Sequence, residues 1–294
     1  MNIGEKIKQL RLSKLMTQTE LAGDHITRNM LSSIEHGSAL PSLSTVLYIA
    51  ERLNVPVGYL LSGEEHDFFY RKMAALPNIR HAFTQKDYAG CLHLLHAFGE
   101  ETDDELSFLR AECEYATALD AIQGGRLRLA VAALDRALTA AAKTAYETSQ
   151  LRERVAVCFR YMTALSTTLV SDVLDAEEIE GARALGDALV EYIMSVEALD
   201  REHPEAADEY LFRYPSTVYA ERIRALLMMR KGDYKQAQQV LEALLGRDEL
   251  TFGVLLYEVF GDLELCYRQN DDYKRAYEFS GSRMGLLERL LEEI

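Results

Sequence analysis

The chain has 294 residues, of which 48% are hydrophobic and 27% charged, proportions typical of a folded chain with about two domains. A membrane-spanning helix needs a run of about 18 apolar residues, and none occurs; the N-terminal segment also lacks the apolar core of a secretion signal. We therefore expect a cytoplasmic protein that contacts no membrane. The four widely spaced cysteines are expected to be buried, reduced thiols: Cys91, Cys113, Cys158 and Cys266.

The charge is unevenly distributed along the chain. The net charge is −15, yet residues 1–63 carry six basic and five acidic side chains, whereas the remainder carries 26 basic and 42 acidic ones. The first segment can therefore approach phosphate groups, while the acidic remainder would repel them. The change coincides with a break at Ser62-Gly63-Glu64-Glu65. We predict a first domain at residues 1–63, a linker at 64–70 and a second domain at 71–294.

Residues 1–63 are predicted to form five short helices. Ile3, Ile7 and Leu10 recur at the spacing of one helix face and indicate the first. The other helix ends are predicted from capping residues: a Thr17–Glu20 capping box opens the second, Thr27 caps the third, Gly37 ends it, Pro41 and Ser42 open the fourth, and Pro56 opens the fifth. The side chains expected in the core are Leu31 and Ile34 of the third helix, Leu43, Val46, Leu47, Ala50 and Leu53 of the fourth, and Leu60 and Leu61 of the fifth.

Two short helices joined by a tight turn inside a small helical cluster are typical of a helix-turn-helix unit. The residues that carry a closer resemblance are Gln18-x-Glu20-Leu21-Ala22, Ile26-Thr27-Arg28-Asn29-Met30-Leu31-Ser32-Ser33-Ile34-Glu35-x-Gly37, Pro41-Ser42-Leu43 and Val55-Pro56-x-x-Tyr59-Leu60-Leu61. This pattern resembles the XRE class, the fold of the lambdoid phage repressors and Cro. One departure is that the turn between Ala22 and Thr27 is a residue shorter than the common pattern, which would tilt the third helix.

The resemblance implies double-stranded DNA as a partner, with the third helix in the major groove. On a helical wheel, Asn29, Ser32 and Ser33 lie opposite Leu31 and Ile34, and Arg28 opens the exposed side. Arginine can bind guanine and asparagine adenine in a bidentate way. The predicted base contacts are Arg28, Asn29, Ser32 and Ser33, and the predicted phosphate contacts are Thr17, Gln18, Thr27, His36 and Ser38. The resemblance also implies that Arg11 pairs with Glu35 as a structural brace.

The rest of the chain shows helical periodicity, no strand pattern and an internal repeat. Four copies of a turn followed by a helix start occur, at Lys86-Asp87-Tyr88-x-x-Cys91, Gly124-Gly125-Arg126-Leu127-x-x-Ala130, Gly232-Asp233-Tyr234-x-x-Ala237 and Asp271-Asp272-Tyr273-x-x-Ala276. Their spacing, in the high thirties of residues, predicts stacked helix pairs and resembles the tetratricopeptide repeat. Residues 140–215 fit poorly, so we expect longer or irregular helices there. Thr102 and Glu105 are predicted to form another capping box.

The two halves together resemble the peptide-sensing RNPP or Rgg-like regulators in architecture. That resemblance implies a peptide or protein effector in a groove of the helical repeats, and the candidate groove residues are Arg160, Tyr161, Tyr192, Tyr219 and Arg222. A core role for the tyrosines remains the alternative. Cys91-x-His93-x-x-His96 lacks the four ligands of a closed zinc site, so we predict no metal and no cofactor. No Ser/His/Asp or Cys/His motif stands in a recognisable local context, so we also predict no enzymatic activity.

The sequence therefore predicts an all-α protein, with a five-helix DNA-binding domain followed by a helical-hairpin solenoid. The function predicted is that of a homodimeric, sequence-specific transcriptional regulator whose second domain binds a peptide or protein effector. Two alternatives stay open. One is a protein-interaction scaffold with an auxiliary DNA-binding head. The other is an antitoxin-like regulator.

Overall fold

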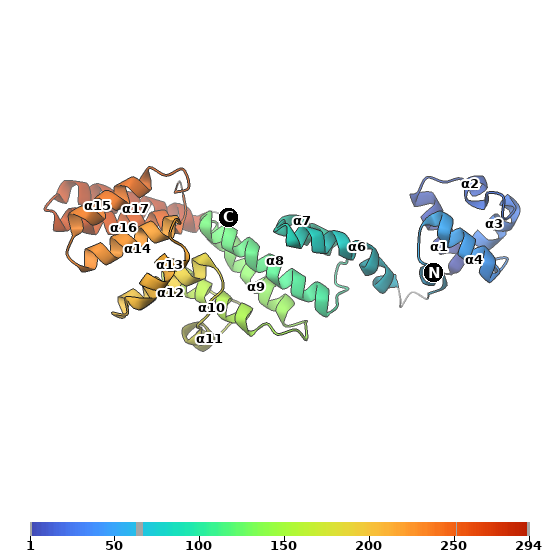
Figure 1. Cartoon of the computed structure of the whole chain (residues 1–294), viewed down its shortest axis with the longest axis horizontal. Coiled ribbons are helices and arrows are strands. Elements are labelled where there is room, and N and C mark those ends of the chain that lie inside the picture. Colours follow the sequence, from blue (N-terminus) through green and yellow to red (C-terminus); the bar gives the residue numbers. More distant parts are fainter. Residues whose placement is uncertain (1, 63–66, 251, 293–294) are drawn as a thin grey trace. The chain divides into compact units, whose positions relative to one another are not determined.

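The computed structural model describes residues 2–62, 67–250 and 252–292, and all of the regular secondary structure in these ranges is helical (Figure 1). The predicted all-α class is confirmed. None of these helices is long and apolar enough to cross a membrane. Their bounds are α1 Ile3–Ser13, α2 Gln18–Ala22, α3 Arg28–Glu35, α4 Leu43–Leu53, α5 Val57–Leu61, α6 Asp67–Thr84, α7 Tyr88–His96, α8 Asp104–Gln123, α9 Leu127–Ala141, α10 Ser149–Thr163, α11 Ala176–Gly181, α12 Ala188–Asp200, α13 Glu205–Arg213, α14 Val218–Arg230, α15 Tyr234–Leu245, α16 Val254–Gln269 and α17 Tyr273–Glu292.

The chain divides into two compact units, Met1–His81 (the N-terminal unit) and Ala82–Ile294 (the C-terminal unit). This division comes later than the boundary predicted after residue 63. Of the predicted linker at 64–70, residues 64–66 lie outside the described residues, and 67–70 belong to α6. Most of α6 belongs to the first unit, and near its start the ring of Tyr70 packs edge-on against Tyr59, with the ring centroids 5.6 Å apart.

The helix starts of the N-terminal unit follow the predicted caps. The Thr17 side chain accepts the backbone N–H of Glu20, whose carboxylate accepts the N–H of Thr17, so the capping box is complete. Thr27 caps α3 and Ser42 caps α4 by accepting the N–H three residues later. Each cap pairs a backbone donor that a helix start leaves unpaired, which is why these short helices begin where they do.

The predicted core is wrong at three positions of the N-terminal unit. Leu43 is 66% exposed, Leu47 is 49% exposed and Leu61 is 57% exposed. The stripe of α4 is rotated relative to the prediction, because Thr45 and Ile49 occupy the inner face in their place. The cluster that does form, around α3, consists of Ile7, Leu21, Ala22, Leu31, Ile34, Val46, Ile49, Ala50, Leu53 and Leu60.

The C-terminal unit is built from antiparallel helix pairs, of which α8 and α9, α12 and α13, α14 and α15, and α16 and α17 lie side by side (Figure 1). The four predicted repeat turns share one geometry. In each, a residue with positive φ ends the first helix: Lys86, Gly125, Gly232 or Asp271. The N–H of the next residue then reaches the carbonyl oxygen five positions earlier, at 2.8–3.0 Å. This is the hydrogen bond of a Schellman ending, which closes the end of the first helix and reverses the chain.

The small residues of the repeat face the interior. Cys91, Ala130, Ala237 and Ala276 are all buried. The predicted irregular segment is also present, because residues 164–175 and 182–187, on either side of the short α11, are not helical. Irregular connections, rather than longer helices, account for the poor match to the repeat there.

Two smaller details of the C-terminal unit concern predicted side chains. The predicted Thr102–Glu105 capping box is wrong: the N-cap of α8 is Asp103, whose side chain accepts the N–H of Leu106, and the Thr102 hydroxyl lies 2.7 Å from that of Ser107. Aspartate is preferred over threonine as an N-cap residue, which agrees with the helix starting one residue later than predicted. The four cysteines are free and buried, as expected, with Cys91 facing inward while His93 and His96 are exposed.

The close crossing of α1 and α3 generates a stability prediction. A Cβ atom added at Gly4 would lie 2.0 Å from the carbonyl oxygen of Ile34, a backbone atom that cannot swing aside. Gly4→Ala should therefore destabilise the N-terminal unit by about 2 kcal/mol or more, although alanine favours a helix. Hydrogen exchange of the amides in residues 3–35 measures this. Gly281→Ala in α17, where a Cβ meets nothing within 4 Å, is the matched control and should be neutral or slightly stabilising. Unchanged protection in Gly4→Ala would contradict the crossing.

Candidate nucleic-acid interface

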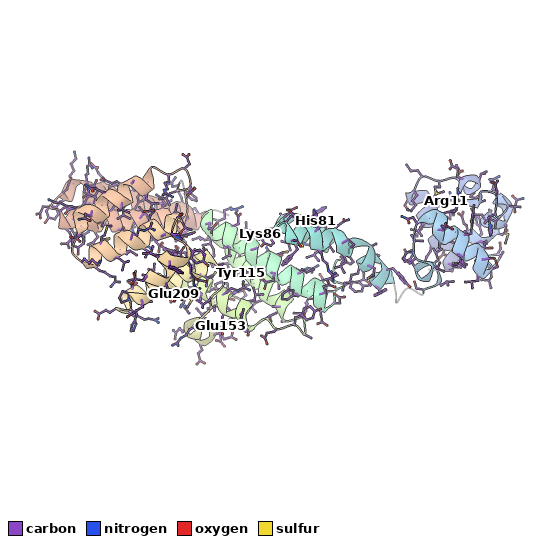
Figure 2. The ribbon with its side chains drawn as sticks, in the orientation of Figure 1. Arg11, His81, Lys86, Tyr115, Glu153 and Glu209 are labelled. Atoms are coloured by element: carbon purple, nitrogen blue, oxygen red, sulfur yellow. The ribbon has the colours of Figure 1, made fainter. Side chains whose placement is uncertain are left out.

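The orientation of α3 depends on one buried carboxylate, that of Glu35. Arg11 of α1 donates two hydrogen bonds to it, Nε to Oε1 at 2.6 Å and Nη2 to Oε2 at 2.9 Å. Gln18 of α2 donates a third through Nε2 to Oε2, at 2.9 Å. The remaining guanidinium nitrogen of Arg11 donates to the carbonyl oxygen of Met16. We call Arg11, Gln18 and Glu35 the carboxylate clamp; it contains the predicted Arg11–Glu35 ion pair and ties three helices together (Figure 2 labels Arg11).

The clamp keeps Glu35 charged despite its burial. Burial alone would raise the pKa of Glu35, but the hydrogen bonds from Arg11 and Gln18 and the charge of Arg11 outweigh it, so the pKa lies below its ordinary value. The hydrogen bond to Glu35 and the charge of that carboxylate raise the pKa of Arg11 above its ordinary value, although burial lowers it. The opposite charge and the hydrogen bonds offset the desolvation penalty that an unpaired buried charge would suffer in full.

The short turn between α2 and α3 is closed by packing on α4. Gly23 has φ of 52°, a left-handed conformation, and an added Cβ would lie 2.2 Å from the hydroxyl oxygen of Tyr48. The ring of His25 stacks on that of Tyr48, with centroids 4.4 Å apart. Glycine is therefore needed at residue 23 both for its backbone conformation and for the close approach of Tyr48.

The outer face of α3 carries the residues predicted to contact bases. Leu31 and Ile34 are buried, as predicted, so the opposite face is turned outward. Arg28 and Asn29 are exposed, and Ser32 and Ser33 are half-buried. Within the described part of the chain, the side chains of Arg28 and Asn29 make no hydrogen bond or ion pair. Both lie in the first turn of α3, so their polar groups are free to reach a partner beyond the helix start.

The side chains of the residues predicted to contact phosphate all make hydrogen bonds within the N-terminal unit, four of them to nearby backbone groups and that of Gln18 to Glu35. Thr17 and Thr27 cap α2 and α3, and Gln18 is part of the carboxylate clamp. His36 Nδ1 lies 2.7 Å from the carbonyl oxygen of Ser32, and the Ser38 hydroxyl donates to the carbonyl oxygen of Ser33. The caps pair the N–H groups of Glu20 and Met30, while those of the first two residues of each helix point outward, as at anion-binding helix starts.

Sequence reasoning missed the role of Lys6. Its ammonium donates to the carbonyl oxygens of Tyr59 and Ser62 and lies 4.7 Å from the centroid of the Tyr59 ring. Lys6 thus fixes α1 against the end of α5 instead of adding to a basic surface. A charge count cannot show this, because its partners are backbone groups more than fifty positions away.

The residues predicted to line an effector groove lie largely inside the C-terminal unit. Tyr192 is fully buried and Arg222 is 6% exposed. Arg222 pairs with Asp262 at 2.7 Å and with Glu258 at 3.0 Å, and the Tyr192 hydroxyl donates to Glu258 at 2.6 Å. Burial raises the pKa of Glu258, against the lowering effects of Arg222 and Tyr192. The prediction that Tyr192 and Arg222 line a groove is therefore not met, because both are buried and paired within the core.

The other three predicted groove residues border this core. The Tyr161 hydroxyl donates to Glu258 at 3.0 Å, and the ring of Tyr219 packs on that of Tyr192 at 4.6 Å. Arg160 pairs with Glu197 and donates to the carbonyl oxygens of Ile179 and Ala182, which holds the irregular segment around α11 in place. None of the three is buried completely.

Comparison with known proteins places the N-terminal unit. Residues 7–60 match the family model described as "Helix-turn-helix". These residues form a helix-turn-helix domain. Over 66 residues the chain is 36% identical to the HTH-type transcriptional activator BcrR of Enterococcus faecalis. These 66 residues are 22% of this chain and 32% of that protein. The domain spans about a third of that relative, so the likeness concerns the helix-turn-helix domain and not the relative as a whole.

Two solved structures are similar over most of the chain. One is the crystal structure of Bacillus thuringiensis PlcR in complex with the peptide PapR7 and DNA, 16% identical, with 99% of each chain covered and a TM-score of 0.26. The other is a cysteine-to-serine variant of the Streptococcus dysgalactiae SHP pheromone receptor Rgg2, 14% identical, with 93% of this chain and 99% of that one covered and a TM-score of 0.21. TM-scores this low do not support transferring a function, so the function of the C-terminal unit is inferred from its own residues.

The carboxylate clamp predicts a pH-dependent contribution to stability. Because the pKa of Glu35 is lower in the folded protein than in the unfolded chain, its contribution is complete above about pH 4.5 and is lost as the pH falls through the lower folded value. At neutral pH, Glu35→Gln should destabilise the N-terminal unit by about 3 kcal/mol, because it leaves Arg11 buried without its anion. Hydrogen exchange across a pH series measures both effects.

The control for this pH series is Glu51→Gln, which neutralises an exposed carboxylate on α4. It should leave stability almost unchanged. The difference between the wild-type chain and Glu35→Gln should shrink in acid. A difference that stayed constant down to the lowest pH would contradict the role of the ionised carboxylate.

The buried position of Arg222 predicts a structural phenotype. Arg222→Ala should lower the stability of the C-terminal unit by about 3–5 kcal/mol, since it leaves Glu258 and Asp262 without their cation. Thermal unfolding followed by circular dichroism measures the change, and Arg201→Ala, at an exposed arginine, is the matched control. A melting curve unchanged by Arg222→Ala would show instead that Arg222 is a surface residue available to a ligand.

Proposed function

We propose that this chain is a sequence-specific DNA-binding transcriptional regulator. The observation that carries the proposal is the outer face of α3: Arg28 and Asn29 are exposed and unpaired within the described residues, while the inner face is buried and Glu35 is held by the carboxylate clamp. Polar side chains on a fixed helix are what base recognition in the major groove requires, because their positions must match donor and acceptor patterns on base edges. The name of the relative BcrR agrees with this function.

The roles proposed for the residues of α3 follow from their chemistry. Arg28 presents a guanidinium fork that matches O6 and N7 of guanine, and Asn29 presents an amide that matches N6 and N7 of adenine. Ser32 and Ser33, set further back and half-buried, would make shorter-range contacts with bases near the centre of the helix. Orientation on the duplex would come from phosphate groups bound at the starts of α2 and α3, where Thr17 and Thr27 leave outward-pointing N–H groups.

The proposed active form is a homodimer on a two-fold operator. One reading helix covers only a few base pairs, and helix-turn-helix proteins gain specificity by placing two such helices about one turn of DNA apart. The acidic composition of the C-terminal unit supports a division of labour, since DNA would be bound by the N-terminal unit alone.

For the C-terminal unit we propose a peptide or protein effector. The support is its construction from stacked helix pairs with a repeated Schellman turn, because such solenoids present extended surfaces suited to peptides and helices. The proposed effector surface does not include Tyr192 and Arg222, because both are buried.

Selection of bound duplexes from a random DNA library tests the DNA-binding proposal. The wild-type chain should enrich an inverted repeat, and Arg28→Ala should bind that repeat about 1–3 kcal/mol more weakly and lose the preference for one guanine in each half-site. Lys14→Ala, which removes an exposed positive charge at the end of α1, is the matched control and should keep the full preference. Equal weakening on all duplexes would make Arg28 a phosphate contact. No enriched motif, with or without cell extract, would favour an interaction scaffold instead.

A further inference from the structure

The helix α17 has two faces of different character. Leu286 and Leu290 are buried, and the helix lies side by side with α16 (Figure 1). On the other side, Tyr277 is 80% exposed, Tyr273 64% and Met284 58%. These three residues stand four and seven positions apart, which places them on one side of the helix. Large side chains gathered on an exposed helix face are typical of a surface that binds a partner.

Two glycines lie beside Tyr277 on the same face. Gly281 follows it by four positions and Gly285 by eight, and a Cβ atom added at either glycine would meet nothing within 4 Å. Glycine destabilises a helix relative to alanine, so neither residue is favoured by the helix itself or required by a contact within the described part of the chain. Without side chains, these two positions let a second helix approach the backbone of α17 closely.

The charged residues of this face are placed symmetrically about Gly281. Lys274 lies seven positions before it and Glu288 seven positions after it. Both side chains are exposed, and neither forms an ion pair or a hydrogen bond with any described residue. Tyr277 and Gly285 show the same symmetry, four positions before and after Gly281. The five positions are separated by three, four, four and three residues, which is the spacing of a single helix face.

This symmetry fits a second copy of α17 in antiparallel orientation. A two-fold axis through Gly281 brings each residue opposite the one equally far on the other side, so every contact occurs twice. Lys274 then meets Glu288, and the ring of Tyr277 lies over the space that Gly285 leaves open. Opposite charges in register favour this arrangement, whereas a parallel pair would set Lys274 against Lys274 and Glu288 against Glu288.

We propose that α17 pairs with α17 of a second copy of this chain, antiparallel and about a two-fold axis at Gly281. The pairing names a contact of the homodimer proposed above and rests on that homodimer, although it needs no DNA. One helix pair is a small interface, so the dissociation constant is expected in the micromolar range. Tyr277 should contribute most to affinity, because an aromatic side chain packed near the centre of an interface is a common hot spot.

Sedimentation velocity of the purified full chain over a range of concentrations, without DNA, tests the pairing. The wild-type chain should dimerise. Lys274→Glu and Glu288→Lys should each raise the dissociation constant about tenfold, because each sets like charges opposite each other twice per dimer. The double variant Lys274→Glu/Glu288→Lys restores the pairs with their signs exchanged and should dimerise within about threefold of the wild-type chain. Lys235→Glu, which reverses an exposed charge on α15, is the matched control and should dimerise like the wild-type chain.

Two further variants probe the packing. Tyr277→Ala should raise the dissociation constant at least about thirtyfold by removing the central aromatic contact. Gly285→Leu should weaken the dimer similarly, because its side chain fills the space that the ring of Tyr277 enters. Circular dichroism should show unchanged helical content and melting temperature for both monomers, since Tyr277 is exposed and nothing lies near Gly285.

Three results would overturn the proposal. A wild-type chain that stays monomeric at every concentration would leave this face to another partner. A dimer unaffected by these substitutions would leave the homodimer intact but place its contact elsewhere than α17. A double variant as weak as the two single ones would contradict the antiparallel register. None of these results bears on DNA binding, which the selection from a random library tests separately.

Discussion

The N-terminal unit depends on the hydrogen-bonded carboxylate of Glu35. Three donors from Arg11 and Gln18 converge on its two oxygens, and those residues stand on α1 and α2. Such a group is stable in the interior only when all its partners are present, so the positions of the three helices are coupled. Leu31 and Ile34 of α3 are buried, which fixes the rotation of that helix about its axis. Its opposite face therefore points outward. The exposure of the residues proposed to contact bases thus follows from the contacts that bury the opposite face of α3.

The C-terminal unit also contains a buried carboxylate, that of Glu258, which connects several helices. Glu258 receives hydrogen bonds from Tyr161 and Tyr192 and pairs with Arg222, so side chains from α10, α12, α14 and α16 meet at one carboxylate. Alternate helices along the solenoid are thereby linked, beyond the contacts that each helix makes with its neighbour. The repeated Schellman turns set the local pairing of helices, and this network adds a connection across several pairs.

Much of the fold follows from local signals that a sequence displays directly. The caps at Thr17, Thr27 and Ser42 and the turns at Gly125 and Gly232 depend on neighbours a few positions away, so residue type and spacing are enough to predict them. The outward face of α3 is predictable for the same reason, because Leu31 and Ile34 define the buried side.

The rest depends on partners distant in sequence. From the sequence, Lys6 would be assigned to the surface, but its ammonium donates to the carbonyl oxygens of Tyr59 and Ser62. Arg222 and Tyr192 are residue types common in ligand sites. Only their contacts with Glu258 and Asp262 of α16 show that they belong to the core. Charge and turn residues predict a boundary after residue 63, whereas the compact unit extends to His81 and includes the packing of Tyr70 on Tyr59.

Hydrogen exchange of the full chain, alone and with a duplex obtained by selection, tests the central claim most directly. If the outer face of α3 reads DNA while the carboxylate clamp holds its inner face, amides at the starts of α2 and α3 should gain protection on binding. The amides around Glu35 should already be protected in the free protein. Protection confined to the C-terminal unit, or a face of α3 that exchanges equally with and without the duplex, would contradict the account.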